Sequence, residues 1–403
     1  MVGAALLLVG GVLWAEEPVT IRMWTNKRPE ERETLREVLG AFQRANPGIR
    51  VVELYYETED LRDRYINFAL GKKGPDLIYG PSDAIGPLAV MKILRPLDDV
   101  ISEPLKQALA SDAFVTFRGA TYQIAPTVGN HLMLIFNQAL VSSPPKTFEA
   151  LIEMGRAFSR DVNGDGVVDR FGLVWNYIEP YFMIPFLSGY GGWVMDEADR
   201  PTLNTPEMVK ALRFIIDLRD RFRIIPSECD YETADALFKE GKALFIINGP
   251  WALPGYTQAG VKFGIGKIPK LPGERRWPTP MKSALGYSVN PNISQAKLVE
   301  VMKLVAFLVD EESQRLSLER DRTLPTHRAV MRAFEKRGDA VTRAILKCRK
   351  GSRSMPVHPN MRVIWDQMRG PYQKAIYGKA TPEEAAAEMQ RNAVLAIAKM
   401  NRQ

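Results

Sequence analysis

Strand-like and helix-like segments alternate along the chain from Val19 onward, and this alternation is the strongest constraint on the fold. An apolar strand face from Val19 to Met23 is followed by a stripe from Leu35 to Phe42 with helical spacing. A second strand-like segment at 49–55, a helical segment and the apolar run 77–79 complete a βαβαβ unit. We therefore predict an α/β protein in which helices flank the sheets.

The length and composition of the chain limit its organisation. At 403 residues it is too long for one hydrophobic core, so two lobes are expected. Apolar residues make up 46% and charged residues 25%, which is typical of a globular protein. The net charge is +7, but Lys and Arg are scattered among acidic residues, so we expect a well-mixed surface and no nucleic-acid partner.

The N-terminus resembles a signal peptide. The stretch 2–14 is almost wholly apolar and is followed by Ala15 and two glutamates. Its thirteen residues fall short of the ~20 that a membrane-spanning helix needs. The Lys or Arg that normally precedes the apolar run of a signal peptide is missing here. We nevertheless expect cleavage after Ala15 and export, with residues 1–15 as the signal peptide.

The cysteines and histidines give no sign of a zinc site or a lipid anchor. Cys229 and Cys348 lie far from the cleavage region, so we expect a soluble periplasmic protein rather than a lipid-attached one. The two thiols either pair in an oxidising compartment or stay as small buried groups. No His lies at ligand spacing from a Cys or another His, which argues against zinc.

Open α/β sheets bind ligands beyond the carboxyl ends of their strands, which points to the loops 26–28 and 80–83. Asp83 either contacts a ligand there or caps the helix that follows. Further along, a helix ending at Gly241 precedes a buried strand at 243–247. The turn after this strand delivers Trp251 to its carboxyl end, where the indole either stacks on a ligand or packs in the core.

Four separated stretches are similar to those of maltose-binding proteins and their relatives among the extracellular solute-binding proteins of ABC importers. The stretches occur in the family's order and span nearly the whole mature chain: Gly74 to Tyr79, Glu179 to Phe182 with Gly191-Gly192 behind it, Asp230 to Ala252, and Met355 to Trp365. The resemblance implies an exported subunit that binds an oligosaccharide and passes it to permease subunits. It implies no catalysis and no required cofactor, and we expect a monomer.

The resemblance also implies the architecture, a type II periplasmic-binding-protein fold with two α/β lobes and several hinge crossings. Carried over, one lobe holds residues 16–128 and 284–324. The other holds 129–283 and 325–403. The lobes are expected to close on the ligand.

Ligand-binding residues carry over one position at a time. Tyr181, Trp251 and Trp365 match stacking aromatics, and Glu179 matches a carboxylate that hydrogen-bonds sugar hydroxyls. Aromatic faces and polar groups side by side suit a sugar, whose rings have apolar C–H patches and whose edges carry hydroxyls. Asp83 matches a polar contact on the opposite lobe.

Other positions match the family loosely or depart from it. Lys27 is the expected counterpart of a family lysine that reaches the ligand. Gly80 and Ala84 stand where maltose binders have Trp and Arg, and Asn130 stands at the hinge in place of a glutamate. These departures predict that the first lobe lacks the family's aromatic wall, cation and acid. They also predict a ligand that differs from maltose in linkage, length or identity.

The segment 161–169 resembles an EF-hand calcium loop. Its expected ligands are side chains or carbonyls of Asp161, Asn163, Asp165, Val167 and Asp169. The twelfth position is Gly172 instead of the usual bidentate Glu, which favours a self-capped Asx turn, with a weak structural calcium as the alternative.

Two other classes of function remain as alternatives. A glycosidase could use Glu179 and Asp83 as a carboxylate pair, although no nucleophile elbow, phosphate loop or metal triad accompanies them. A binding protein for a non-sugar such as a phosphorylated polyol would suit the basic net charge.

Overall fold

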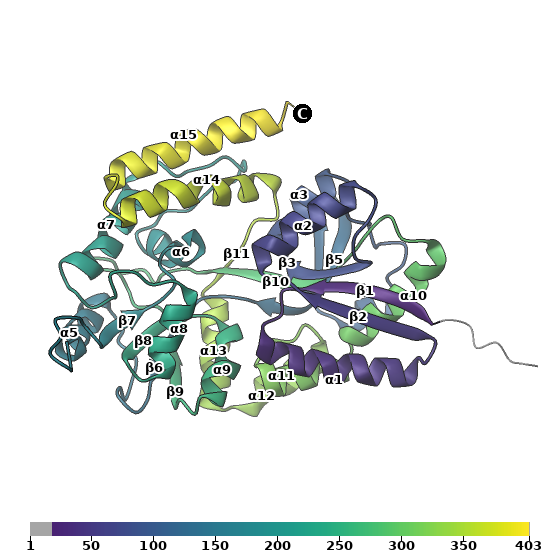
Figure 1. Ribbon diagram of the computed structural model, residues 1–403, viewed down its shortest axis with the longest axis horizontal. Helices are drawn as coiled ribbons and strands as arrows, with labels where there is room; N and C mark the ends of the chain where they lie inside the picture. The colour runs from purple at the N-terminus through teal and green to yellow at the C-terminus, as the bar shows by residue number, and fades with distance from the viewer. Residues whose placement is uncertain (1–17, 403) are drawn as a thin grey trace, which may run out of the picture.

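Two separate β-sheets form the framework of the protein. The structure, a computed structural model, describes residues 18–402. Each sheet packs against its own helices, and the two resulting lobes lie side by side along the long axis of the molecule (Figure 1). The α/β class and the two-lobe organisation predicted from the sequence are confirmed.

The larger sheet has seven strands, in the order β2-β1-β3-β10-β5-β4 with β11 beside β10. They are β1 (Val19–Thr25), β2 (Ile49–Tyr55), β3 (Leu77–Pro81), β4 (Phe114–Phe117), β5 (Ala120–Gly129), β10 (Met281–Val289) and β11 (Arg353–Ser354). β1 runs parallel to β2 and β3, whereas β10 is antiparallel to β3 and β5. The carboxyl ends of β1, β2 and β3 therefore meet at one edge, where a ligand is expected.

Helices cover both faces of this sheet because its strands bury apolar side chains on both sides. Ile21 and Met23 of β1 share a core cluster with residues of α1 and α10, whereas Trp24 shares a second cluster with residues of α2 and α3. The helical elements here are α1 (Pro29–Ala45), α2 (Thr58–Leu70), the 3-10 helix η1 (Ser82–Ala84), α3 (Ile85–Val90), α4 (Glu103–Ala108), the 3-10 helix η2 (Ser111–Ala113), α10 (Gln295–Leu308) and α11 (Glu311–Asp321). The stripe predicted for α1 is buried, as expected from its spacing.

The smaller sheet has the order β7-β8-β6-β9. Its strands are β6 (Met133–Asn137), β7 (Phe171–Val174), β8 (Ala243–Asn248) and β9 (Phe263–Gly266). Every residue of β8 is buried, so this apolar run forms the centre of the second lobe's core. The predicted strand at 243–247 and the helix stop at Gly241, which has φ +70°, are confirmed.

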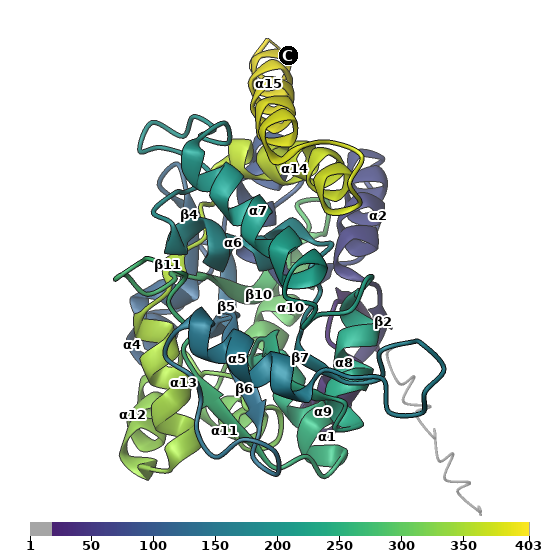
Figure 2. The same cartoon turned by 90° about the vertical axis from the view of Figure 1, so that its left-hand side faces the viewer.

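The helices of the second lobe come from two parts of the chain. Those before the return to the larger sheet are α5 (Phe148–Phe158), α6 (Pro180–Gly189), α7 (Pro206–Asp220), α8 (Tyr231–Lys239), the 3-10 helix η3 (Pro250–Ala252) and α9 (Leu253–Gln258). The C-terminal ones are α12 (Arg328–Arg337), α13 (Ala340–Lys350), α14 (Pro359–Ile376) and α15 (Pro382–Met400). Figure 2 shows α15 at one end of the molecule and α12 at the opposite end.

The chain passes from the larger sheet to the smaller one directly after β5 and returns in β10. The predicted lobe boundaries after Val128 and before Ala284 fall within these two strands. Asn130 lies in the first crossing with φ +40°, a left-handed conformation that Asn tolerates better than most residues. The predicted hinge residue is thus at a point where the chain direction changes sharply.

The cysteines and the helices bear on covalent state and membrane topology. Cys229 and Cys348 are both buried free thiols, so the disulfide alternative is not supported. Within residues 18–402 no helix combines the length and apolar character needed to cross a membrane. The predicted signal peptide at 1–15 lies outside the described residues.

Candidate ligand-binding site

A cavity of about 380 Å³ lies between the two lobes, within the size range of small-molecule sites. Six of the seven predicted ligand-binding residues line it: Asp83, Asn130, Glu179, Tyr181, Trp251 and Trp365. The first lobe contributes the loop after β1, the ends of β2 and β3, and α2. The second lobe contributes the starts of α6 and α8, together with η3 and α14. The structure thus brings together residues that are far apart in the sequence.

Trp251 reaches the cavity because of the turn that follows β8. Asn248 ends the strand, and its side-chain oxygen accepts a hydrogen bond from the Gly249 amide at 2.9 Å. The indole of Trp251 then folds back over Gly249, where an added Cβ would lie 2.0 Å from the ring. Only glycine therefore allows this orientation, which leaves Trp251 partly exposed at the cavity wall.

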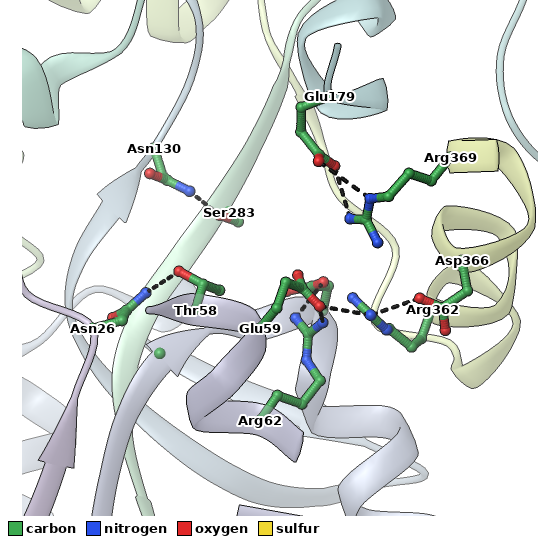
Figure 3. Close-up of polar contacts among 12 residues, drawn as sticks. Asn26, Thr58, Glu59, Arg62, Asn130, Glu179, Ser283, Arg362, Asp366 and Arg369 are labelled. Atoms are coloured by element: carbon green, nitrogen blue, oxygen red, sulfur yellow. Dashed lines mark hydrogen bonds and ion pairs between the residues drawn. The ribbon is translucent and has the colours of Figure 1, made fainter. Parts of the chain in front are cut away.

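Tyr181 and Trp365 form a second aromatic group, from α6 and α14. Their ring centroids lie 6.4 Å apart at an interplanar angle of 65°, an edge-to-face arrangement. The Tyr181 hydroxyl donates a hydrogen bond to the carbonyl oxygen of Asn130 at 2.6 Å. Asn130 in turn donates to the Ser283 hydroxyl oxygen at 2.9 Å, so the aromatic group is tied to both crossing strands (Figure 3).

Glu179 lies at the start of α6 and points toward Arg369 of α14 (Figure 3). The guanidinium donates to both carboxylate oxygens, at 3.0 and 3.3 Å. Burial raises the pKa of Glu179, and the hydrogen bonds from Arg369 oppose that shift. The pair is therefore a preorganised acceptor and donor on the cavity wall rather than a free carboxylate.

Asp83 does not cap a helix, so that alternative is wrong. Its carboxylate accepts a hydrogen bond from Arg62 of α2 at 3.2 Å, and both side chains are buried. Arg62 also donates to Glu59 at 2.8 Å. Burial raises the pKa of Asp83, and the charge of Arg62 opposes the rise.

Arg362 of α14 connects the lobes. Its guanidinium lies 2.6 Å from Glu59 of α2 and 2.6 Å from Asp366 of its own helix (Figure 3). A second contact between the lobes places the Arg28 guanidinium 4.0 Å from the ring centroid of Tyr231 in α8. The structure therefore has the lobes touching around the cavity, as expected for a closed clamp.

Lys27 is the one predicted ligand-binding residue that does not line the cavity, so the structure does not support that assignment. Its side chain is buried, with the ammonium group 4.5 Å from the ring centroid of Tyr79 and 3.9 Å from Glu31. Burial lowers the pKa of Lys27, but Glu31 and neighbouring acidic groups raise it above its ordinary value overall. Its two neighbours in the sequence, Asn26 and Arg28, line the cavity instead. The prediction therefore chose the right loop but the wrong residue of it.

The first lobe contributes more aromatic and cationic groups to the cavity than its departures from the family suggested. Tyr55 and Tyr79 of this lobe line the cavity, although Gly80 itself carries no side chain there. Arg62 places a cation beside Asp83 from a different helix. Aromatic and cationic groups therefore reach the cavity from this lobe at positions other than Gly80 and Ala84, and a ligand that differs from maltose stays a prediction.

The missed residues carry recognisable signals. Tyr55 ends β2, so the strand-end rule applied to β1 and β3 also covers it. Arg362 and Arg369 lie three residues before and four residues after Trp365 in α14, which places all three on one helical face. Arg62 has no comparable signal, because its role depends on the packing of α2 against η1.

The buried carboxyl of Asp321 yields a prediction about pH. It accepts a hydrogen bond from Thr34 at 2.7 Å, and burial raises its pKa to about 7, although Lys27 opposes the shift. The unfolded chain binds this proton with a pKa of ~3.9, so ionisation destabilises the fold increasingly from about pH 4 to pH 7. Asp321→Asn should raise the free energy of unfolding on the order of 3 kcal/mol at pH 8 and little at pH 4.

Urea unfolding at both pH values measures this difference. Glu319→Gln, on the exposed side of the same helix, is the matched control and should change little at either pH. An Asp321→Asn variant that is only as stable as the parent at pH 8 would contradict the raised pKa of the Asp321 carboxyl.

The predicted calcium loop is an exposed Asx-turn structure. The Asp161 carboxylate accepts hydrogen bonds from the backbone amides of Gly164 at 2.6 Å and Gly166 at 2.7 Å. Asn163 and Asp165 each accept from the amide two residues on. Residues 18–402 contain no group of three or more His, Cys, Asp or Glu placed to hold a metal ion, and calcium binding stays a prediction.

Comparisons with known proteins agree with this geometry. Residues 37–336 match the sequence profile of the bacterial extracellular solute-binding protein family. The maltotriose-binding protein of Pyrococcus abyssi is 27% identical over an alignment that covers 64% of this chain and 56% of that relative's length. The galactooligosaccharide-binding protein of Bacillus subtilis is 25% identical over 90% of this chain and 86% of its own length.

Two solved structures have the same fold. The maltose/maltodextrin-binding domain MalE from Bdellovibrio bacteriovorus, bound to maltotriose, is 40% identical with a TM-score of 0.91. The Thermus thermophilus maltotriose-binding protein, also bound to maltotriose, is 25% identical with a TM-score of 0.85. Each similarity covers 94% of this chain and 100% of the other.

Proposed function

The chain belongs to the bacterial extracellular solute-binding protein family, and from that premise we propose that it binds a neutral maltooligosaccharide between its lobes. The observation that carries the proposal is the cavity between the lobes, where Trp251 and the Tyr181–Trp365 pair lie beside ion-paired carboxylates and arginines. As a monomer in the periplasm, the protein delivers this ligand to the permease of an ABC importer.

The cavity suits a neutral polyhydroxyl ligand on physical grounds. Aromatic faces cover the apolar C–H patches of sugar rings. The paired charges, such as Glu179 with Arg369, hold acceptors and donors in fixed positions for hydroxyl groups. A ligand that satisfies these groups avoids the cost of leaving them buried without partners.

The charges of the cavity argue against a phosphorylated ligand. Six carboxylates and four arginines line it: Glu31, Glu57, Glu59, Asp83, Glu179, Glu232, Arg28, Arg62, Arg362 and Arg369. Three of the arginines are already paired with carboxylates, and Arg28 lies over Tyr231. A phosphate would therefore need to break an ion pair and approach an acidic surface.

The proposal contains no catalytic step. Glu179 and Asp83 are each hydrogen-bonded to an arginine, so neither is a free acid or nucleophile in this state. The relatives and the family are binding proteins by description. Prolonged incubation with maltotriose, followed by chromatography, should return the sugar intact.

A thermal-shift series tests the function directly. A ligand that binds only the folded state at 100 times its dissociation constant adds about 2.7 kcal/mol to the free energy of unfolding. Maltotriose should therefore raise the melting temperature by several degrees. Galactooligosaccharides and a polyol phosphate serve as comparison ligands. A shift with the phosphate alone, or with no sugar in the series, would overturn the proposal.

Calcium, if bound at Asp161 to Asp169, should affect stability and not ligand choice. The loop is exposed, and none of its residues lines the cavity. Melting in excess calcium and in chelator should then differ by a few degrees, while maltotriose affinity stays the same. Asp161→Asn should abolish the difference. Equal melting in both solutions would leave the Asx turn as the complete description of the loop.

A further inference from the structure

Positive charge is concentrated in two segments, contrary to the evenly mixed surface expected from the sequence. Residues 328–353 contain nine Lys and Arg against two acidic residues, and residues 262–282 contain six against one. The whole chain has a net charge of only +7, so the remainder is acidic on balance. The charge asymmetry is therefore a property of particular surfaces and not of the composition.

The fold brings these two segments together. The Cys348 thiol of α13 lies 3.4 Å from the carbonyl oxygen of Gly266 in β9, and the Arg353 amide donates to Pro280 at 2.9 Å. Figure 2 shows α12, α13 and β11 along one side of the molecule, away from α15. The two segments are therefore neighbours in the fold.

Six cations define this basic face: Lys267, Lys270, Arg343, Lys347, Lys350 and Arg353. The last four are exposed and the two lysines of the loop are half-buried. Across residues 18–402, no carboxylate lies within 4.0 Å of any of them, whereas their neighbours Arg349 and Arg337 are ion-paired. None of the six lines the cavity. The face therefore presents uncompensated charge to solvent.

Trp277 lies within the basic face. The ammonium groups of Lys267 and Lys270 are 5.5 and 5.3 Å from the centroid of its half-buried ring. Tryptophan and lysine together are typical of the headgroup region of a lipid bilayer, where an amphipathic ring meets anionic groups. This chemistry is not needed for sugar binding.

We propose that the basic face docks reversibly on an anionic phospholipid surface. The cations spread along a helix and a loop instead of converging on a pocket, which suits a plane of phosphate groups better than one bound anion. Each basic residue near such a surface contributes about a fivefold gain in partitioning at moderate ionic strength. The cavity is lined by other residues, so a docked protein can still hold its ligand.

Sedimentation of the full chain with vesicles tests the proposal. We expect it to bind vesicles containing phosphatidylglycerol at low ionic strength, to be released by high salt, and not to bind neutral phosphatidylcholine vesicles. Arg343→Glu with Lys350→Glu should lower the partition coefficient at least about tenfold. Inorganic phosphate at matched ionic strength should leave binding unchanged.

Arg391→Glu with Lys399→Glu on α15 is the matched control. Each pair of substitutions reverses one exposed charge within a helix and one in the last turn of that helix. The two pairs change the net charge equally. This control should still bind, and both variants should melt like the parent. Equal loss in the two variants, binding to neutral vesicles, displacement by phosphate, or no binding at low salt would each overturn the proposal.

Discussion

Replacing Trp251 with alanine is expected to weaken maltotriose binding by about 5- to 150-fold. The indole is partly exposed at the cavity wall and is held by its own turn, since it folds over Gly249. Removing it deletes a rigid apolar face without disturbing the buried strand β8 beneath it. Isothermal titration calorimetry with maltotriose measures the loss.

Trp277→Ala is the matched control for this experiment. Trp277 is also half-buried, but it lies on the basic face and not in the cavity. Its removal should leave maltotriose affinity unchanged. Trp365→Ala is a weaker test, because that ring is only 5% exposed and its loss also removes core packing. A Trp251→Ala variant that folds normally and binds as tightly as the parent would show that the indole has no role in recognition.

The local signals that predicted Trp251 were strong because several physical rules agree there. A glycine stop, an apolar run and an Asn-Gly-Pro turn each constrain the chain over a few residues. The helical stripe of α1 was equally clear, because burial on one face leaves a regular spacing. Features set by short-range geometry could therefore be predicted from the sequence.

The charged network of the cavity could not be predicted in the same way. Glu59 meets Arg362 only because α2 and α14, about three hundred residues apart, face each other across the cavity. An ion pair leaves no periodic signal in a sequence, and either partner alone is an ordinary surface residue. Arg62 beside Asp83 was missed for the same reason.

The error at Lys27 has a different physical origin. The loop after β1 does reach the cavity, but successive side chains in an extended segment point in opposite directions. Asn26 and Arg28 therefore face the cavity, while Lys27 is buried against Tyr79. An alignment error of one residue therefore places the wrong side chain in the cavity. Sequence similarity in a loosely matched loop is too weak to detect such an error.

Gly86→Ala is expected to weaken maltotriose binding at least about 30-fold by preventing full closure. Gly86 lies in α3 of the first lobe, and an added Cβ would be 2.0 Å from the carbonyl oxygen of Val357, just before α14 of the second. The obstructing atom belongs to the backbone, so no rotamer change relieves the clash, and the two segments must separate. A clash present only in the closed state reduces the fraction of protein competent to bind.

Small-angle scattering and calorimetry together distinguish this effect from general destabilisation. The variant should melt like the parent without sugar and should fail to become more compact when maltotriose is added. Gly370→Ala is the matched control, because this glycine of α14 has no atom within 4 Å of its added Cβ and the change should leave binding intact. If Gly86→Ala instead lowers the melting temperature without sugar, the contact is permanent. In that case α3 and the segment before α14 move as one body, and closure must occur elsewhere between the lobes.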